Sequence, residues 1–401
     1  MELYPCLGCA VFVLQDMLWH RYAERSGAQA CRGSLCCGAC RAVWGTSMPG
    51  QSMLRGMPGG LGHKHAGEST LRGMPGGLGH RSLCREGGFM EMTLENIEEW
   101  MSDCTLCPRR CHVDRRAGAK GFCRQGLEPA AARAALHFWE EPCLCGSTGS
   151  GAVFFSGCSL QCVFCQNHDI ALGTGGYAVP LERLVRIFLE LQDKGAANIN
   201  LVTAGHFIPQ LCYAIPRARQ QGLSIPIVYN SSGYEEVSSL GLLDGLVDIY
   251  LPDLKYRSPQ LSAQYSHAPD YFEKASAAIG EMFRQVGRPV FAPDSGLMKR
   301  GVIVRHLLLP GHVGDSKRIL RYLHDTYRND IYVSIMNQYT PMRHLAQMPQ
   351  LNQTELSRKV TAEEYERVLD FADQIGIENG YMQEGDAAAE SFIPAFDGEG
   401  L

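Results

Sequence analysis

The sequence predicts an α/β fold: a partial barrel of six parallel strands with helices between them, preceded by a small cysteine-rich lobe. Short apolar runs alternate with amphipathic helical patterns from about residue 150 onward, which indicates a parallel sheet covered by helices. Distinctive polar side chains or cysteines follow nearly every strand. Barrels gather their functional side chains at the carboxyl ends of the strands. The pattern therefore favours a partial barrel over a doubly wound sheet, which also fits the order of elements.

Composition sets broad limits on the class of protein. The 401 residues are 45% hydrophobic and 20% charged, with a net charge of −5 and 17 cysteines. No dense stripe of lysine and arginine suggests nucleic-acid binding, and no run reaches the roughly 18–20 apolar residues of a membrane span. The closely spaced cysteines are more typical of metal ligation in a reducing compartment than of disulfides. We therefore expect a cytoplasmic protein.

The first segment, residues 1–89, differs from the rest. It contains 17 glycines and 7 cysteines, and LRGMPGGLGH occurs twice, at 54–63 and 71–80. Such glycine and proline content opposes both helix and strand, so we expect this segment to be disordered. One hypothesis is that it is translated upstream sequence and that the natural start is Met90 or Met92. The alternative is a genuine flexible extension whose cysteines bind metal.

Residues 90–147 are predicted to form the cysteine-rich lobe. A short helix at 93–101 precedes four cysteines in a C-x2-C-x3-C-x11-C arrangement, namely Cys104, Cys107, Cys111 and Cys123. Four thiolates suit either a tetrahedral zinc ion or an auxiliary iron–sulfur cluster. The alternative is a set of reduced, purely structural cysteines.

The core of the predicted barrel covers residues 148–380, and 381–401 form a C-terminal tail. Its apolar strand candidates are 151–156, 198–203, 225–230, 246–251, 301–308 and 331–336. Helical patterns are clearest at 181–195, 316–327 and 361–376. The last of these begins with a capping-box pattern formed by Thr361 and Glu364.

Three cysteines follow the first core strand in the stretch GCSLQCVFCQN. Cys158, Cys162 and Cys165 have C-x3-C-x2-C spacing, and the aromatic Phe164 comes directly before the third. A structural zinc site requires four protein ligands. A 4Fe–4S cluster held by three cysteines instead keeps one iron open for another ligand. The spacing and the place after a strand together favour such a cluster.

These motifs resemble the radical S-adenosylmethionine (radical SAM) superfamily, whose cluster motif is C-x3-C-x-aromatic-C. The resemblance runs from about residue 100 to the C-terminus and is nearest to the PflX-like branch, the homologues of pyruvate formate-lyase activating enzyme. It implies a partial (β/α)6 barrel of the radical SAM type. The stretches that carry it are CTLCPRRC, EEPC, GAVFFSGCSLQCVFCQN, YNSSGYE, YLPDLKY, VRHLLLPG and SIMNQYTP.

The resemblance implies cofactors and an activity. Cys158, Cys162 and Cys165 would ligate a 4Fe–4S cluster whose fourth iron is chelated by S-adenosylmethionine. Reductive cleavage of that molecule would give a 5′-deoxyadenosyl radical that abstracts hydrogen from a substrate. A low-potential flavodoxin or ferredoxin would supply the electron, and a glycyl-radical enzyme is one candidate protein substrate.

Further cofactor-binding residues are expected after the other strands. Asp253 and Lys255 match an Asp-x-Lys motif of the activating enzymes, and a lysine ammonium suits a carboxylate of the cofactor. Asn230 and Ser231 stand where those enzymes carry Asp-Thr-Asn-Gly. Thr203 stands where many superfamily members have a Gly-Gly-Glu motif, so it either holds the amino group of the cofactor or is a turn residue.

At the end of the fifth strand, Arg305 and His306 are candidates for a ribose or adenine contact, although a histidine there is equally often a structural hydrogen-bonding group. A second class of function also fits the sequence: a non-catalytic iron–sulfur or zinc protein that serves electron transfer or scaffolding. Electron carriers usually use four cysteine ligands. The three-cysteine loop and the Asp-x-Lys motif therefore favour the enzyme.

Overall fold

The structure is a computed structural model that describes residues 11–13, 84–85, 88–89, 92–348, 354–383 and 394–401. The chain forms two compact units, one made of residues 1–21 with 90–401 and the other of residues 22–89. In the second unit, β2 (Cys84–Arg85) pairs antiparallel with β3 (Gly88–Phe89). The disorder and the internal start predicted for residues 1–89 fall almost entirely outside the described residues, so both stay predictions.

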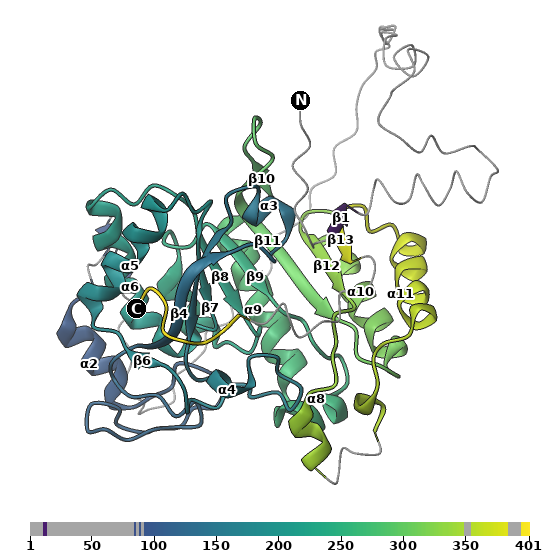
Figure 1. The fold of residues 1–401 in the computed structure, drawn as a ribbon, viewed down its shortest axis with the longest axis horizontal. Coiled ribbons are helices and arrows are strands. Elements are labelled where there is room, and N and C mark those ends of the chain that lie inside the picture. The colour runs from purple at the N-terminus through teal and green to yellow at the C-terminus, as the bar shows by residue number, and fades with distance from the viewer. Residues whose placement is uncertain (1–10, 14–83, 86–87, 90–91, 349–353, 384–393) are drawn as a thin grey trace, which may run out of the picture. The chain divides into compact units, whose positions relative to one another are not determined.

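The first unit is built on one sheet, which runs through the middle of the ribbon in Figure 1. Its parallel strands are β5 (Ser150–Phe155), β7 (Ile199–Val202), β8 (Ile227–Ser231), β9 (Ile249–Pro252), β11 (Met298–Leu307), β12 (Tyr332–Met336) and β13 (Gly380–Gln383). Antiparallel strands complete it: β1 (Val11–Val13), β4 (Ala130–His137), β6 (Tyr177–Ala178) and β10 (Val290–Phe291).

The strand order is β1-β13-β12-β11-β9-β8-β7-β5-β4-β6, with β10 paired to β11. The two ends of this series are not paired with each other, so the sheet is open, as a partial barrel requires. β5 and β7 are buried at every position, the pattern of parallel strands covered on both faces. The α/β class and the partial barrel are thereby confirmed.

Helices connect the strands, with α5 and α6 at the left of the view in Figure 1 and α10 and α11 at the right. They are α2 (Leu94–Ser102), α3 (Pro142–Cys145), α4 (His168–Ala171), α5 (Leu181–Asp193), α6 (Ile208–Gln220), α7 (Val237–Leu240), α8 (Pro259–Ser266), α9 (Tyr271–Val286), α10 (Val313–Tyr327) and α11 (Ala362–Ile375). Short 3-10 turns lie at Gly205–Phe207, Gly241–Leu243, Arg343–Gln347 and Glu355–Ser357.

Local signals in the sequence account for the helix ends. Thr361 accepts a hydrogen bond from the Glu364 backbone N–H at 3.2 Å, and the Glu364 carboxylate accepts one from the Thr361 N–H at 3.0 Å. This reciprocal pair satisfies two N–H groups that the first turn leaves open. α11 stops at Gly376, whose φ of +86° ends the helix in the left-handed conformation. The predicted capping box is therefore present.

The sheet extends beyond the six predicted strands. β4, which lies within the predicted lobe, pairs antiparallel with β5, and β13 adds a seventh parallel strand next to β12. Residues 394–401 run alongside β4. The Ala134 N–H donates to the Glu399 carbonyl at 2.8 Å, and the Gly398 N–H donates to the Ala132 carbonyl at 3.0 Å. Within the described part of the chain, no helix is long and apolar enough to cross a membrane.

Candidate functional site

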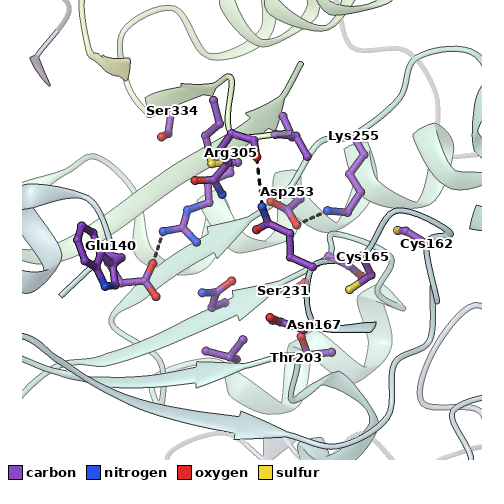
Figure 2. Close-up of a pocket in the computed structure, with 18 of the residues that line it drawn as sticks. Glu140, Cys162, Cys165, Asn167, Thr203, Ser231, Asp253, Lys255, Arg305 and Ser334 are labelled. Atoms are coloured by element: carbon purple, nitrogen blue, oxygen red, sulfur yellow. Dashed lines mark hydrogen bonds and ion pairs between the residues drawn. The ribbon is translucent and has the colours of Figure 1, made fainter. Parts of the chain in front are cut away.

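A cavity of about 250 Å³ opens at the carboxyl ends of the parallel strands. Figure 2 shows the residues that line it, which converge from successive strand ends. Parallel strands end at one edge of a sheet, so residues far apart in the sequence meet there. Nine of the predicted site residues line this cavity: Cys158, Cys162, Cys165, Thr203, Asn230, Ser231, Asp253, Lys255 and Arg305.

His306 is the predicted cofactor-binding residue that does not line the cavity. It is buried, and its two ring nitrogens lie 2.8 Å from the Leu254 carbonyl and 2.8 Å from the Ser316 hydroxyl. Burial lowers the pKa of the imidazole, so the neutral ring links β11 to α10. This placement favours the structural alternative for His306.

The three-cysteine loop begins directly after β5 and places all three thiols in the cavity. Cys158 and Cys162 are buried, and Cys165 is partly so. The Leu160 N–H donates to the Cys158 sulfur at 3.3 Å. Burial raises the pKa of Cys158 to about 11. Without a bound metal these thiols are therefore neutral at pH 7, and binding a metal would release their protons.

Contacts on either side hold this loop in place. Phe164 packs edge-on against Tyr256, Tyr265 and Tyr339, with ring centroids 6.1–6.5 Å apart. The Val163 N–H donates to the Tyr265 carbonyl at 2.9 Å. The aromatic residue before the third cysteine, which the sequence singled out, thus anchors the loop against the barrel.

Asp253 and Lys255 follow β9 and form an ion pair of 2.5 Å on the cavity wall (Figure 2). Burial alone would lower the pKa of Lys255, but the Asp253 carboxylate offsets that effect, and the pKa lies above its ordinary value. The ammonium is therefore charged at every physiological pH. A charged donor beside three thiols can bind a carboxylate or stabilise thiolates.

The turn after β8 supports the Asp253 backbone. Gly233 has a φ of +78°, and a Cβ on it would overlap the Asp253 carbonyl oxygen. The Tyr271 hydroxyl bridges this turn to β9, donating to the Ser232 and Asp253 carbonyls at 2.8 and 3.0 Å. The Ser231 hydroxyl accepts from the Gly233 N–H at 2.9 Å and donates to Glu235 at 2.8 Å. Ser231 therefore shapes the turn as well as lining the cavity.

Thr203 carries an unusual backbone conformation where β7 ends. Its φ is +59°, a region that β-branched residues rarely occupy and that costs of order 1–3 kcal/mol. Its N–H donates to the Asn230 carbonyl at 2.8 Å, which fixes the strained residue against β8. Strain retained at the mouth of a cavity is consistent with a binding role.

Glu140 and Glu141 are site residues that the sequence reasoning did not assign. Both are buried at the start of α3 and line the cavity with Arg305. Arg305 donates to Glu141 at 2.8 and 2.5 Å and also contacts Glu140, which accepts a further bond from Asn200 at 2.8 Å. The two carboxylates raise the pKa of the buried guanidinium. The EEPC stretch was the only signal, and it carried no spacing that pointed to Arg305.

Two observations bear on metal binding. The four lobe cysteines are free, with Cys104, Cys107 and Cys123 buried. Within the described residues, no group of three or more histidine, cysteine, aspartate or glutamate side chains is arranged to hold a metal ion. Thiolates that bind one zinc lie about 3.8 Å apart, as Zn–S bonds of about 2.3 Å require. A cuboidal cluster spreads its thiolates more widely because each one binds a different iron.

No protein-family model matches the chain. A search of curated proteins finds an uncharacterized protein of Methanocaldococcus jannaschii, 28% identical over 298 residues, which span 72% of this chain and 80% of that protein. Among solved structures, Streptococcus suis SuiB bound to precursor peptide SuiA has a TM-score of 0.39 and 12% identity. SuiB bound to S-adenosylmethionine has a TM-score of 0.38 and 14% identity. The alignments cover 57% of this chain but only 46% and 48% of the SuiB chains, less than half of their length.

Proposed function

We propose that this chain is a radical SAM enzyme, in which Cys158, Cys162 and Cys165 hold a 4Fe–4S cluster and the adjoining cavity binds S-adenosylmethionine. One observation carries the proposal: the three thiols and the Asp253–Lys255 pair line a single cavity at the carboxyl ends of the strands. With the cofactors bound, the chemistry supplied is reductive cleavage of S-adenosylmethionine to a 5′-deoxyadenosyl radical.

The donor set fits the cluster. Three thiols leave one iron without a protein ligand, and the Leu160 N–H already donates to the Cys158 sulfur. Such N–H···S bonds favour the thiolate form that ligates iron.

The remaining residues divide the cavity into two regions. Beside the thiols, we assign Lys255 to the carboxylate of S-adenosylmethionine, and Thr203 and Asn230 line the same cavity from the neighbouring strand ends. At the other end, Arg305 is held by Glu140 (Figure 2) and by Glu141. We assign this charged end to the nucleoside or to the substrate. The protein positions the reactants and excludes water.

Partners and place in the cell belong to the same proposal. A flavodoxin or ferredoxin would deliver the electron, the protein would act in the cytoplasm, and a glycyl-radical enzyme would be the protein substrate. These three statements are supported by the motif resemblance alone. Anaerobic capture of a glycyl-radical enzyme from cell extract, followed by detection of its glycyl radical by electron paramagnetic resonance, tests the last of them.

The central test is anaerobic reconstitution with iron and sulfide, addition of dithionite and S-adenosylmethionine, and quantification of 5′-deoxyadenosine. We expect release of 5′-deoxyadenosine by the wild-type chain and by Cys212→Ser, which alters a buried cysteine on α6 away from the cavity. Cys162→Ala should abolish it. A chain that binds iron but never cleaves S-adenosylmethionine under strong reductant would instead be an electron carrier.

A further inference from the structure

We propose that the lobe binds a second metal centre: a 4Fe–4S cluster closed by the four thiolates of Cys104, Cys107, Cys111 and Cys123. The lobe backbone brings these cysteines together. The Cys104 N–H donates to the Val113 carbonyl, and the His112 N–H donates to the Cys104 carbonyl, both at 3.1 Å. These bonds close a loop that holds the first three cysteines.

The fourth cysteine joins through a close approach of the chain to Cys111. The Phe122 N–H donates to the Cys111 sulfur at 3.3 Å. A Cβ on the preceding Gly121 would lie 2.7 Å from that sulfur, so the position has room only for glycine unless Cys111 moves. Cys123 follows directly and is buried.

The lobe repeats the local geometry of the three-cysteine loop. In both places a backbone N–H donates to a cysteine sulfur at 3.3 Å, that of Phe122 to Cys111 and that of Leu160 to Cys158. Residues beside the lobe cysteines also adopt the left-handed region, which costs free energy in residues other than glycine. They are Arg110 with φ +41°, His112 with φ +53° and Arg124 with φ +59°.

A buried charge in the lobe calls for an anion. Among the basic side chains of the lobe, Arg110 and Arg116 pair with Glu236 and Asp114. The Arg115 side chain is buried and donates only to the Gly126 and His206 carbonyls. Within the described residues no carboxylate neutralises this guanidinium. A buried cation is costly without a counter-charge, and a cluster held by four thiolates is anionic.

Four thiolates can close a 4Fe–4S cluster with one thiolate at each iron. One zinc ion held by the same four thiolates is the alternative that the metal count distinguishes.

The second centre would adjoin the first. A Cβ on Gly157, the residue before Cys158, would lie 2.5 Å from the Cys123 carbonyl. The Gln161 side chain donates to the Phe122 carbonyl at 2.8 Å, and Arg109 donates to the Ser159 carbonyl at 2.8 Å. A cluster in the lobe would thus fix the surface against which the three-cysteine loop packs.

The test counts metal in a chain that cannot build the first cluster. The triple variant Cys158→Ala, Cys162→Ala, Cys165→Ala is reconstituted anaerobically with iron and sulfide, and iron, sulfide and zinc are measured per chain. We expect about four iron and four sulfide per chain, against about eight of each in the wild-type chain.

Matched variants locate that metal. In the triple-variant background, Cys107→Ser with Cys123→Ser should remove the iron. Cys143→Ser with Cys212→Ser, which alters two buried cysteines outside both groups, should retain it. Loss of all iron from the triple variant, or one zinc per chain in its place, would overturn the second cluster. The iron count of the triple variant does not depend on whether the Cys107→Ser, Cys123→Ser variant folds. It is also independent of S-adenosylmethionine cleavage by the wild-type chain, so the two proposals fail separately.

Discussion

At the scale of single residues, the Asp253–Lys255 pair is the strongest charged contact beside the thiols. Both side chains are mostly buried, with 22% and 15% of their surface exposed. Pairing offsets much of the cost of burying each charge. The pair is therefore a stabilising element of the cavity wall and, in our proposal, the anchor for the cofactor carboxylate.

Replacing Lys255 with methionine separates these two roles. We expect Lys255→Met to lower 5′-deoxyadenosine release about 10–100-fold, because a charge-assisted hydrogen bond contributes about 1.5–3 kcal/mol. The iron content should not change. The double variant Lys255→Met, Asp253→Asn removes the unpaired charge, so thermal stability should recover while release stays low. Full activity in either variant would exclude Lys255 as a binding residue.

Glu235 links stability to pH. Burial raises its pKa to about 7, and one of its carboxylate oxygens has no hydrogen-bond partner. As the pH rises from the ordinary value of 4.5 toward 7, the unfolded chain ionises this carboxyl first. The stability that the protonated carboxyl contributes is therefore present below pH 4.5 and lost as the pH approaches 7.

Glu235→Gln should abolish this dependence. At pH 8 we expect its free energy of unfolding to exceed that of the wild type by on the order of 1–3 kcal/mol, and at pH 4 the two should agree. Denaturant unfolding at both pH values measures the difference. Glu98→Gln, at an exposed position on α2, serves as the control. An equal effect of the two substitutions would show that Glu235 is not the group responsible.

Adjacent residues show how far sequence reasoning reaches at this scale. Arg305 and His306 follow one another on β11, and successive strand residues point to opposite faces. Arg305 lines the cavity, whereas His306 contacts the backbone of Leu254, just after β9, and Ser316 on α10. Strand alternation could have indicated that only one of the two faces the cavity. Nothing in the sequence tells which one, because that depends on register.

At the scale of elements, the turn between β8 and α7 positions Asp253 through a glycine. Gly233 combines a positive φ with a backbone atom in the way of any side chain. Gly118 in the lobe has a similar φ of +82°, but nothing lies within 4 Å of where its Cβ would be. Comparing these two glycines separates the cost of backbone strain from the cost of steric overlap.

We expect Gly118→Ala to cost about 1–2 kcal/mol of stability, the price of a left-handed alanine. Gly233→Ala should cost clearly more, because it also displaces the Asp253 carbonyl, and it should reduce 5′-deoxyadenosine release. Chemical denaturation and the release assay measure the two effects. If Gly233→Ala were no worse than Gly118→Ala, the turn would not determine the position of Asp253.

Some strands can be predicted from the sequence and others cannot. The six predicted strands are long apolar runs and correspond to β5, β7, β8, β9, β11 and β12. β4 reads AAARAALH, and alanine favours helix over strand, so pairing with β5 decides its conformation. β13 is only GYMQ, too short for a periodic signal.

At the scale of the whole molecule, the end of the chain contributes to the first strands. Phe396 packs edge-on against Phe154, a cavity-lining residue on β5, with ring centroids 5.6 Å apart. Arg133 on β4 donates to Asp397 at 3.0 Å. A tail of eight described residues thus completes the wall of a site whose thiols lie more than 200 residues earlier in the sequence.

Phe396→Ala should therefore lower both stability and cofactor binding. We expect a loss of about 1–3 kcal/mol, less than for a fully buried phenylalanine, with weaker binding of S-adenosylmethionine. Phe138→Ala is the matched control because that ring is 49% exposed, and it should change stability by less than about 0.5 kcal/mol. Calorimetry measures both quantities.

The pairing of β1 with β13 determines whether the edge of β13 is covered, and a shorter chain would lack β1. Residues 11–13 donate and accept backbone hydrogen bonds along β13, and they precede both proposed internal starts. A polypeptide initiated at Met92 would carry an uncapped outer strand, with a free row of amide and carbonyl groups that invites edge-to-edge aggregation. Light scattering of the full-length chain and of the chain that starts at Met92, at rising concentration, would reveal this aggregation. Self-association should grow only in the shorter chain.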